Sequence, residues 1–253
     1  MLAELKALRW MFVAYLLVLE GMLWLAVWFW PEVEENLEAL TNMAPLPMLK
    51  EILAKVADEG VVPYLNAQHF FKGCNGVGAL VAVILAMGAV AGEAHRGTLE
   101  LWLARPFSRR RILAERFVAG AIVLLVPVFA TTASLPLLAE SVNEDVELAP
   151  MLLCAVHQSL FLLCVYAAAF LCSCLVSTPL YIAFGFLVGA VFEFAIYLVP
   201  KVTHTSVFRL SDVEVYQRIH STGALDATMA SAMGIVVAGL VVAAERAFAR
   251  RTP

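Results

Sequence analysis

Residues 93–113 read EAHRGTLELWLARPFSRRRIL, a charged stretch that lies between two apolar blocks, each about 20 residues long. Within it, Leu99, Trp102 and Leu103 recur at i, i+3 and i+4, which is typical of one face of a helix. Arg105-Pro106 ends this helix, because the residue before a proline is biased away from helical geometry. The stretch therefore predicts a short amphipathic helix between two longer apolar ones.

Two hydroxyl residues mark helix starts on either side of the short helix. Thr98 directly precedes it, and Ser108 precedes the next apolar block. Side-chain oxygens at such positions accept hydrogen bonds from the first backbone N–H groups of a helix. We expect both residues to act as N-caps.

The composition places the chain in a membrane. Its 253 residues are 62% hydrophobic and 15% charged, whereas soluble domains are roughly half apolar and a quarter charged. The charges fall in short clusters between apolar blocks, which leaves no basic footprint for nucleic acid. The five cysteines lie in or beside apolar blocks and do not form a disulfide framework.

Six apolar blocks are long enough to cross a bilayer, so we predict an all-α integral membrane protein built as one domain over 1–253. Lys6 and Arg9 precede the first block, which lacks a small-residue cleavage site and is therefore expected to be retained. The expected helices span about 10–30, 73–92, 112–138, 150–176, 180–200 and 225–248.

The positions of lysine and arginine predict the orientation, because cytoplasmic loops are rich in these residues. If the N-terminus is cytoplasmic, most of the arginines fall on the inner side, including those of the segment 93–111. Both termini are then cytoplasmic, and 31–72 forms a long outer loop. Leu49, Ile52, Leu53 and Val56 of that loop share a helical face, which predicts an interfacial helix on the outer leaflet.

The central stretch resembles a known family. The pattern Glu-x-x-x-Gly-Thr-Leu-Glu-Leu-x-Leu-x-x-Pro-x-Ser-Arg, found from Glu93 to Arg109, is similar to the cytoplasmic signature of type-2 ABC exporter permeases. Six helices, cytoplasmic termini and a long first outer loop also fit that family. A helix that lies in the lipid headgroups is the alternative interpretation of the stretch.

The resemblance implies a dimer of membrane subunits, formed with a second copy or a homologous permease, in which the segment is a coupling helix seated on a separate ATP-binding subunit. The chain has no phosphate-binding loop of the Gly-x-x-x-x-Gly-Lys type, so ATP and Mg are expected on that partner, and no catalytic residue is assigned here. The expected partner-binding residues are Glu93, Gly97, Thr98, Leu99, Glu100, Trp102, Leu103, Arg105, Pro106, Ser108 and Arg109.

Two further features concern the membrane interior. Gly185 and Gly189 form a Gly-x-x-x-Gly pattern that lets helices approach closely, either within the chain or across a dimer seam. Glu20 and Glu193 lie near the middle of the first and fifth helices, where carboxylates are costly and often functional. They are candidates for the translocation path, with packing across the dimer as the alternative.

A stripe of soft ligands runs along the fourth helix. Cys154, His157, Cys164 and Cys172 recur at roughly helical spacing. Only the first two are close enough on one helix to share a metal, so we expect no metal site and interpret the stripe as packing. Its presence keeps open a role in an assembly or maturation machinery.

The resulting prediction is a permease subunit of an ATP-driven exporter in the bacterial inner membrane, surrounded by lipid and free of nucleic acid. An ion-driven secondary transporter is the first alternative, although the repeated halves typical of that class are not visible. A membrane-embedded hydrolase is the second, and no catalytic motif such as His-Glu-x-x-His is present.

Overall fold

The computed structural model describes residues 2–45, 47–104 and 107–251, and the regular structure within these ranges is helical, without strands. Six segments are long and apolar enough to cross a membrane. They are Leu2–Glu35, Val61–Ala89, Arg109–Glu140, Leu148–Leu175, Pro179–Leu198 and Ala227–Ala249. The predicted all-α membrane fold with six spans is confirmed.

The second span begins earlier than the sequence suggested. It consists of α4 (Val61–Leu65), the π-helix η1 (Asn66–Gly78) and α5 (Ala79–Ala89). We expected a loop through residue 72, because the stretch contains several polar side chains. The bundle satisfies them internally: Asn66 donates to Gln217 at 3.3 Å, and a ring nitrogen of His69 lies 3.1 Å from the Thr132 hydroxyl.

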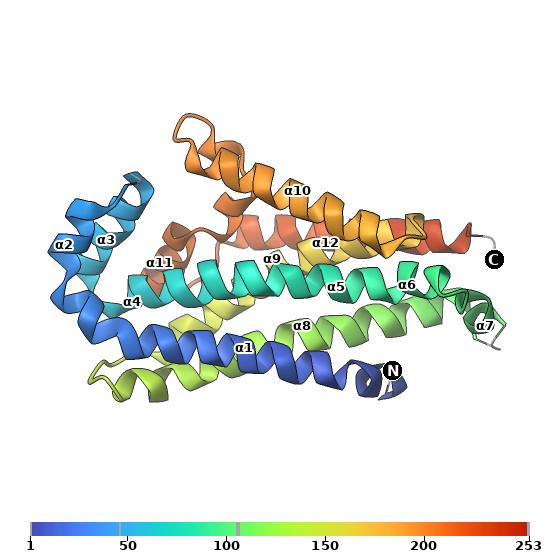
Figure 1. Ribbon diagram of the computed structural model, residues 1–253, viewed down its shortest axis with the longest axis horizontal. Coiled ribbons are helices and arrows are strands. Elements are labelled where there is room, and N and C mark those ends of the chain that lie inside the picture. Colours follow the sequence, from blue (N-terminus) through green and yellow to red (C-terminus); the bar gives the residue numbers. More distant parts are fainter. Residues whose placement is uncertain (1, 46, 105–106, 252–253) are drawn as a thin grey trace.

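The short helices gather at the two ends of the bundle (Figure 1). One end holds α2 (Leu37–Met43), α3 (Pro47–Glu59), α4 and α11 (Val213–Thr222). The opposite end holds both termini, α6 (Ala91–His95) and α7 (Leu99–Leu103). The first end corresponds to the predicted outer side, and the second to the predicted cytoplasmic side.

The helix α9 (Leu148–Leu175) is the centre of the bundle and packs against α5, α8 (Arg109–Glu140), α11 and α12 (Ala227–Ala249). Its Tyr166 ring stacks on Phe117 of α8 with centroids 4.9 Å apart. The Tyr166 hydroxyl reaches the backbone of Gly120 so closely that a β-carbon there would overlap it. This glycine permits α8 and α9 to approach each other.

The segment between α10 (Pro179–Leu198) and α12 folds back against the bundle. It contains the 3-10 helices η2 (Thr203–Thr205) and η3 (Val207–Ser211) before α11. The Ser211 hydroxyl oxygen lies 2.8 Å from Gln158 Oε1, and Gln158 Nε2 donates to Asn75 at 2.7 Å. Since these groups are buried, the hydrogen bonds offset the cost of removing them from water.

The outer surface of the bundle is strongly apolar. α1 (Leu2–Glu35) exposes Trp10 near its start and the paired rings of Trp24 and Trp28 further along. Tryptophans are enriched at the two membrane interfaces, which fits a helix that faces lipid. Within their 18-residue apolar windows, only 11% of α10 and of α12 is buried, so these two helices also face lipid or a partner.

Candidate functional site

A break in the second span initiates the candidate coupling segment. α5 ends at Ala89, Val90 leaves helical geometry with φ −124° and ψ −52°, and α6 follows. The interruption frees two backbone N–H groups, which donate to the hydroxyl of Ser173 on α9 at 3.2 and 2.9 Å. The break is thus held in place by the central helix.

The end of α6 explains the glycine of the signature. Gly97 has a φ of +71°, a region that other residues adopt only with strain. Its N–H donates to Ala94 O at 3.1 Å, and the N–H of Thr98 donates to Glu93 O at 3.0 Å. This pair of bonds is the Schellman arrangement, which ends a helix and reverses the chain direction. Gly97 therefore directs the chain from α6 into α7.

Thr98 has a different role from the one expected. Its hydroxyl forms a short hydrogen bond to the carboxylate of Glu93 and lies 3.3 Å from Glu93 O. In the described residues it does not accept a bond from the backbone of α7, so the N-cap prediction for Thr98 is wrong. The hydroxyl instead fastens the start of α7 to α6.

Glu93 belongs to an ion-pair cluster that joins three parts of the chain. Its carboxylate lies 2.6 Å from Arg96 and 3.5 Å from Arg116 of α8. Arg116 also lies 3.7 Å from Glu4 of α1 and donates to Ala89 O, where the second span breaks. The Arg116 side chain is only 8% exposed. These ion pairs join α1, α6 and α8 at the break in the second span.

The environment of Glu93 favours its charged form. Partial burial opposes ionisation, but the Thr98 hydrogen bond and the charges of Arg116 and Arg96 outweigh it and hold the pKa of Glu93 below its usual value. The cluster thus places two guanidinium groups beside the carboxyl groups of Glu93 and Glu4.

The described part of α7 buries one of the predicted anchors and exposes a leucine that was not predicted as one. Leu99, expected as an anchor for a partner, is buried in its own chain at 8% exposure. Leu101, which we placed off that face, is 70% exposed and lies beside the exposed Glu100. The Trp102 and Leu103 side chains, and Arg105 and Pro106 as a whole, lie outside the described residues. Leu101 was missed because helical periodicity alone cannot tell which side a protruding helix turns toward its own bundle.

After the coupling segment, Ser108 begins α8. Its hydroxyl accepts a hydrogen bond from the N–H of Arg111 at 3.3 Å, which confirms the predicted N-cap. Next to it, Phe107 is half exposed beneath the guanidinium of Arg111, with 4.8 Å between the guanidinium carbon and the ring centroid. Phe107 and Leu101 are thus the described apolar side chains that this segment exposes.

Arg109 is occupied within the chain. Its guanidinium donates to Ala249 O at 3.2 Å and to Arg251 O at 2.6 Å, at the end of α12. Arg251 in turn donates to Ser173 O at 3.1 Å and to other groups at the end of α9. The two arginines tie the start of α8 and the ends of α9 and α12 together.

The family comparison covers nearly the whole chain, including the segment just described. The model described as "ABC-2 family transporter protein" matches residues 11–251. The chain belongs to the ABC-2 transporter family. This confirms the resemblance inferred from the signature and identifies a multi-pass permease subunit of an ABC transporter. A comparison with curated proteins finds no match.

In this ABC-2 subunit, the two intramembrane carboxylates have separate roles. Glu20 of α1 is half-buried and accepts a hydrogen bond from Ser134 of α8 at 3.0 Å. Glu193 of α10 accepts from the N–H of Val207 at 2.9 Å and from the Ser206 hydroxyl at 3.2 Å. Glu193 therefore binds the start of η3, whose N-cap is Ser206, a contact that the sequence did not indicate.

The candidate dimer seam of the ABC-2 subunit is open. At Gly185 and Gly189 a β-carbon would meet no atom within 4 Å, so neither glycine serves packing within the chain. The side chains beside them on α10 are large, apolar and exposed, among them Leu187 and Val188.

The stripe on α9 does not converge on a point. Cys154 and Cys164 lie 3.5 and 3.6 Å from the backbone oxygens of Tyr216 and Met233, while His157 lies 2.7 Å from Leu210 O. Among the residues that the structure describes, no group of three or more His, Cys, Asp or Glu side chains could hold a metal ion. These side chains join α9 to the segments packed around it.

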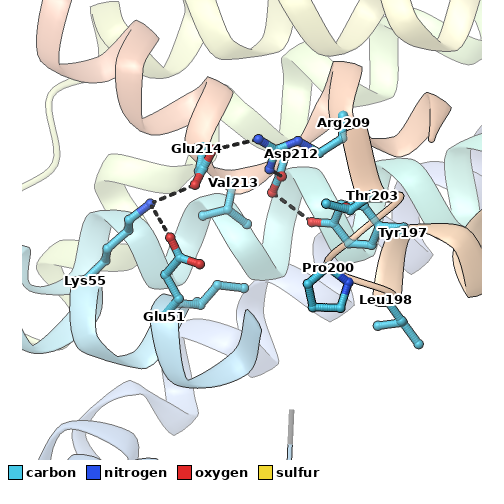
Figure 2. Close-up of a pocket in the computed structure, with 11 residues that line it drawn as sticks. Glu51, Lys55, Tyr197, Leu198, Pro200, Thr203, Arg209, Asp212, Val213 and Glu214 are labelled. Carbon is cyan, nitrogen blue, oxygen red and sulfur yellow. Dashed lines mark hydrogen bonds and ion pairs between the residues drawn. The ribbon is translucent and has the colours of Figure 1, made fainter. Parts of the chain in front are cut away.

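A charged pocket lies at the opposite end of the ABC-2 subunit (Figure 2). It measures about 190 Å³ between α3, the end of α10 and the start of α11. Lys55 lies 3.6 Å from Glu214, and Arg209 lies 2.6 Å from Asp212, whose other oxygen accepts from Tyr197 at 2.8 Å. The ionised side chains in this pocket are paired with one another, so it joins α3 to α11 and the loop before it.

Proposed function

We propose that this chain is the permease subunit of an ATP-driven exporter and that α7 docks on a separate ATP-binding subunit. The observation that carries the proposal is the segment from α6 to Ser108, a short protruding helix with an exposed leucine, braced by a buried ion-pair cluster against two membrane helices. An amphipathic helix that inserts apolar anchors into a groove is a common mode of protein recognition.

Leu101 is the anchor that the geometry favours. It is 70% exposed at the tip of the segment, with Glu100 beside it as a polar rim. Exposed apolar side chains surrounded by polar residues typically mark protein interfaces. Phe107, which is 49% exposed and lies four residues beyond the end of α7, is a second exposed apolar side chain of this segment.

The ion-pair cluster supplies the route by which docking acts on the membrane helices. A movement of α7 is transmitted through Thr98 to Glu93 and from there to Arg116 of α8, which also contacts Glu4 of α1. Closure of two ATP-bound partner subunits would thereby move α1 and α8 together. ATP and Mg are held by the partner, and the permease converts its movement into a change of access across the inner membrane.

The transport path is proposed to form between two permeases, a pair of identical or homologous subunits. α10 supplies the seam, because Gly185 and Gly189 are open and the surrounding face is apolar and exposed. Glu20 of α1 is the polar side chain proposed to face the path, since it is half-buried and, among the residues that the structure describes, its partner is one hydroxyl group.

Co-purification of the permease with an ATP-binding subunit encoded beside it tests the docking proposal. Leu101→Glu is expected to abolish the complex while the protein still inserts and purifies as a single species, because a carboxylate cannot enter an apolar groove. Leu2→Glu is the matched control: Leu2 is 73% exposed at the same end of the bundle. Retention of the partner by Leu101→Glu, or its loss with both variants, would rule out α7 as the docking element.

A further inference from the structure

A groove between α9 and α12 opens at the end of the bundle that holds the termini. It has a volume of about 520 Å³ and is lined by six residues. They are Leu171, Leu175, Ala243, Arg246, Ala247 and Arg250. The groove lies apart from α7, so the proposed docking surface does not account for it.

The lining has a regular order. Leu171 and Leu175 are one turn apart on α9, and Ala243 and Ala247 are one turn apart on α12, so four apolar side chains form the two walls. Arg246 of α12 and Arg250, the C-cap that follows its last residue, are likewise four residues apart and therefore lie on one side of the helix. The result is an apolar channel with two guanidinium groups along its edge.

Two arginines of the groove are unpaired within the part of the chain that the structure describes. Neither the Arg246 nor the Arg250 guanidinium has a hydrogen-bond or ion-pair partner among those residues, and both side chains are exposed. The neighbouring arginines are occupied: Arg110 pairs with Glu245 at 2.8 Å, and Arg109 and Arg251 bind backbone carbonyls. Arg246 and Arg250 are thus available to an anion from outside the chain.

We infer that this groove binds one anionic phospholipid, with its phosphate on Arg246 and Arg250 and an acyl chain along Leu171, Leu175, Ala243 and Ala247. Guanidinium groups bind phosphate oxygens through paired hydrogen bonds, and basic pockets between membrane helices on the cytoplasmic side select anionic headgroups. Alanines on α12 leave room for a chain, while the leucines on α9 provide apolar contact. Small-molecule anions would satisfy the arginines but leave the walls uncovered.

Native mass spectrometry of the purified chain tests this with phosphatidylglycerol and phosphatidylcholine as probes. The wild type is expected to retain one phosphatidylglycerol and to prefer it over phosphatidylcholine. Arg246→Ala combined with Arg250→Ala should weaken that binding about thirtyfold, since each basic residue near an anionic surface contributes roughly a fivefold factor. The control is Lys6→Ala with Arg9→Ala, which removes two exposed charges from the same end and should leave binding unchanged.

Two further measurements distinguish lipid binding in the groove from attraction by the arginine charges alone. Ala243→Phe fills the channel and keeps both arginines, so it should also displace the lipid. If the larger residue prevents folding, Leu175→Ala is used instead, because it removes part of the wall at a side chain that is 65% exposed. Glycerol phosphate, which has the headgroup without chains, should fail to compete. Three outcomes would overturn the proposal. They are an equal loss of phosphatidylglycerol binding in the Lys6 and Arg9 control, equal binding of both lipids, and competition by glycerol phosphate. A fourth is intact lipid binding in the Arg246 and Arg250 variant accompanied by loss of a second copy or of the ATP-binding subunit.

Discussion

Arg116 is the residue on which the coupling segment depends. It comes from α8, yet its guanidinium reaches Glu93 before α7, Glu4 of α1 and the carbonyl at the break of the second span. A guanidinium can make several such contacts because its five N–H donors spread in one plane. One side chain of α8 thus contacts α1, α6 and the end of α5 at the proposed cytoplasmic surface.

Replacement of Arg116 by Ala is expected to lower the free energy of unfolding by about 2–3 kcal/mol, because it removes the buried guanidinium that faces the partly buried carboxylates of Glu4 and Glu93. Arg96→Ala is the matched control. It removes a second arginine from the same Glu93, but the Arg96 side chain is 61% exposed, and such pairs contribute at most about 1 kcal/mol. Thermal unfolding of the detergent-solubilised protein measures both. Equal losses would show that burial of Arg116 is unimportant.

The depressed pKa of Glu93 predicts how its contribution depends on pH. A carboxyl group with a folded-state pKa below its unfolded value contributes stability above the unfolded pKa and loses it as the pH falls through the folded pKa. Glu93→Gln should therefore be less stable than the wild type at pH 7, and the difference should shrink below about pH 4. Melting temperatures across this range test the prediction. Glu38→Gln, at an exposed carboxylate, should show little difference at either pH.

At the scale of elements, α3 is held at the opposite end of the bundle by charge. Lys55 lies 3.6 Å from Glu214 of α11 and 3.9 Å from Glu51 of its own helix. Val56 is buried while Leu49 is 40% exposed, so only part of the amphipathic face contacts the protein. Partial burial and charge desolvation oppose ionisation of Glu214, but Arg209 and Lys55 outweigh them and keep its pKa below the usual value.

Lys55→Ala should loosen α3 from α11. Since Lys55 is 29% exposed, the loss is expected to be about 0.5 kcal/mol, which roughly doubles the rate at which the α3 amides exchange with deuterium. Lys50→Ala on the same helix, where the lysine is exposed, is the control and should leave exchange unchanged. If both variants exchange alike, the contact between Lys55 and Glu214 does not hold α3.

The sequence predicted these elements to the extent that hydrophobicity and charge identify them. Apolar runs located six spans, and Ser108 was recognised as a cap from its position alone. The start of the second span could not be found, because the polar side chains of 66–72 are satisfied by residues far along the chain, such as Gln217. The partners of Glu193 could not be predicted for the same reason: they lie on a segment that folds back, which periodicity cannot show.

For the whole molecule, the distribution of exposed apolar surface distinguishes the helices. Half of the apolar window of α9 is buried, whereas only 11% of the windows of α10 and α12 is. Lipid can cover both, but only α10 combines that exposure with two open glycines one turn apart. We therefore expect α10 to meet a second permease and α12 to remain in contact with lipid.

Cysteine crosslinking in membranes compares the two helices directly. Val188→Cys on α10 should give a disulfide-linked dimer under mild oxidation, because equivalent positions approach each other across a twofold seam. Val236→Cys on α12 is the matched control, since both valines are 50% exposed. The wild type, which has five native cysteines, gives the background level of crosslinking. A dimer through Val236→Cys alone would assign the seam to α12.

The bonds made by Arg251 also bear on how the protein is assembled during synthesis. This side chain donates to the carbonyls that end α9, on residues translated 75 to 78 positions earlier. α9 is the centre of the bundle, yet its last turn stays without these donors until α12 has left the ribosome and entered the bilayer. The end of the middle helix is therefore among the last parts of the bundle to be completed.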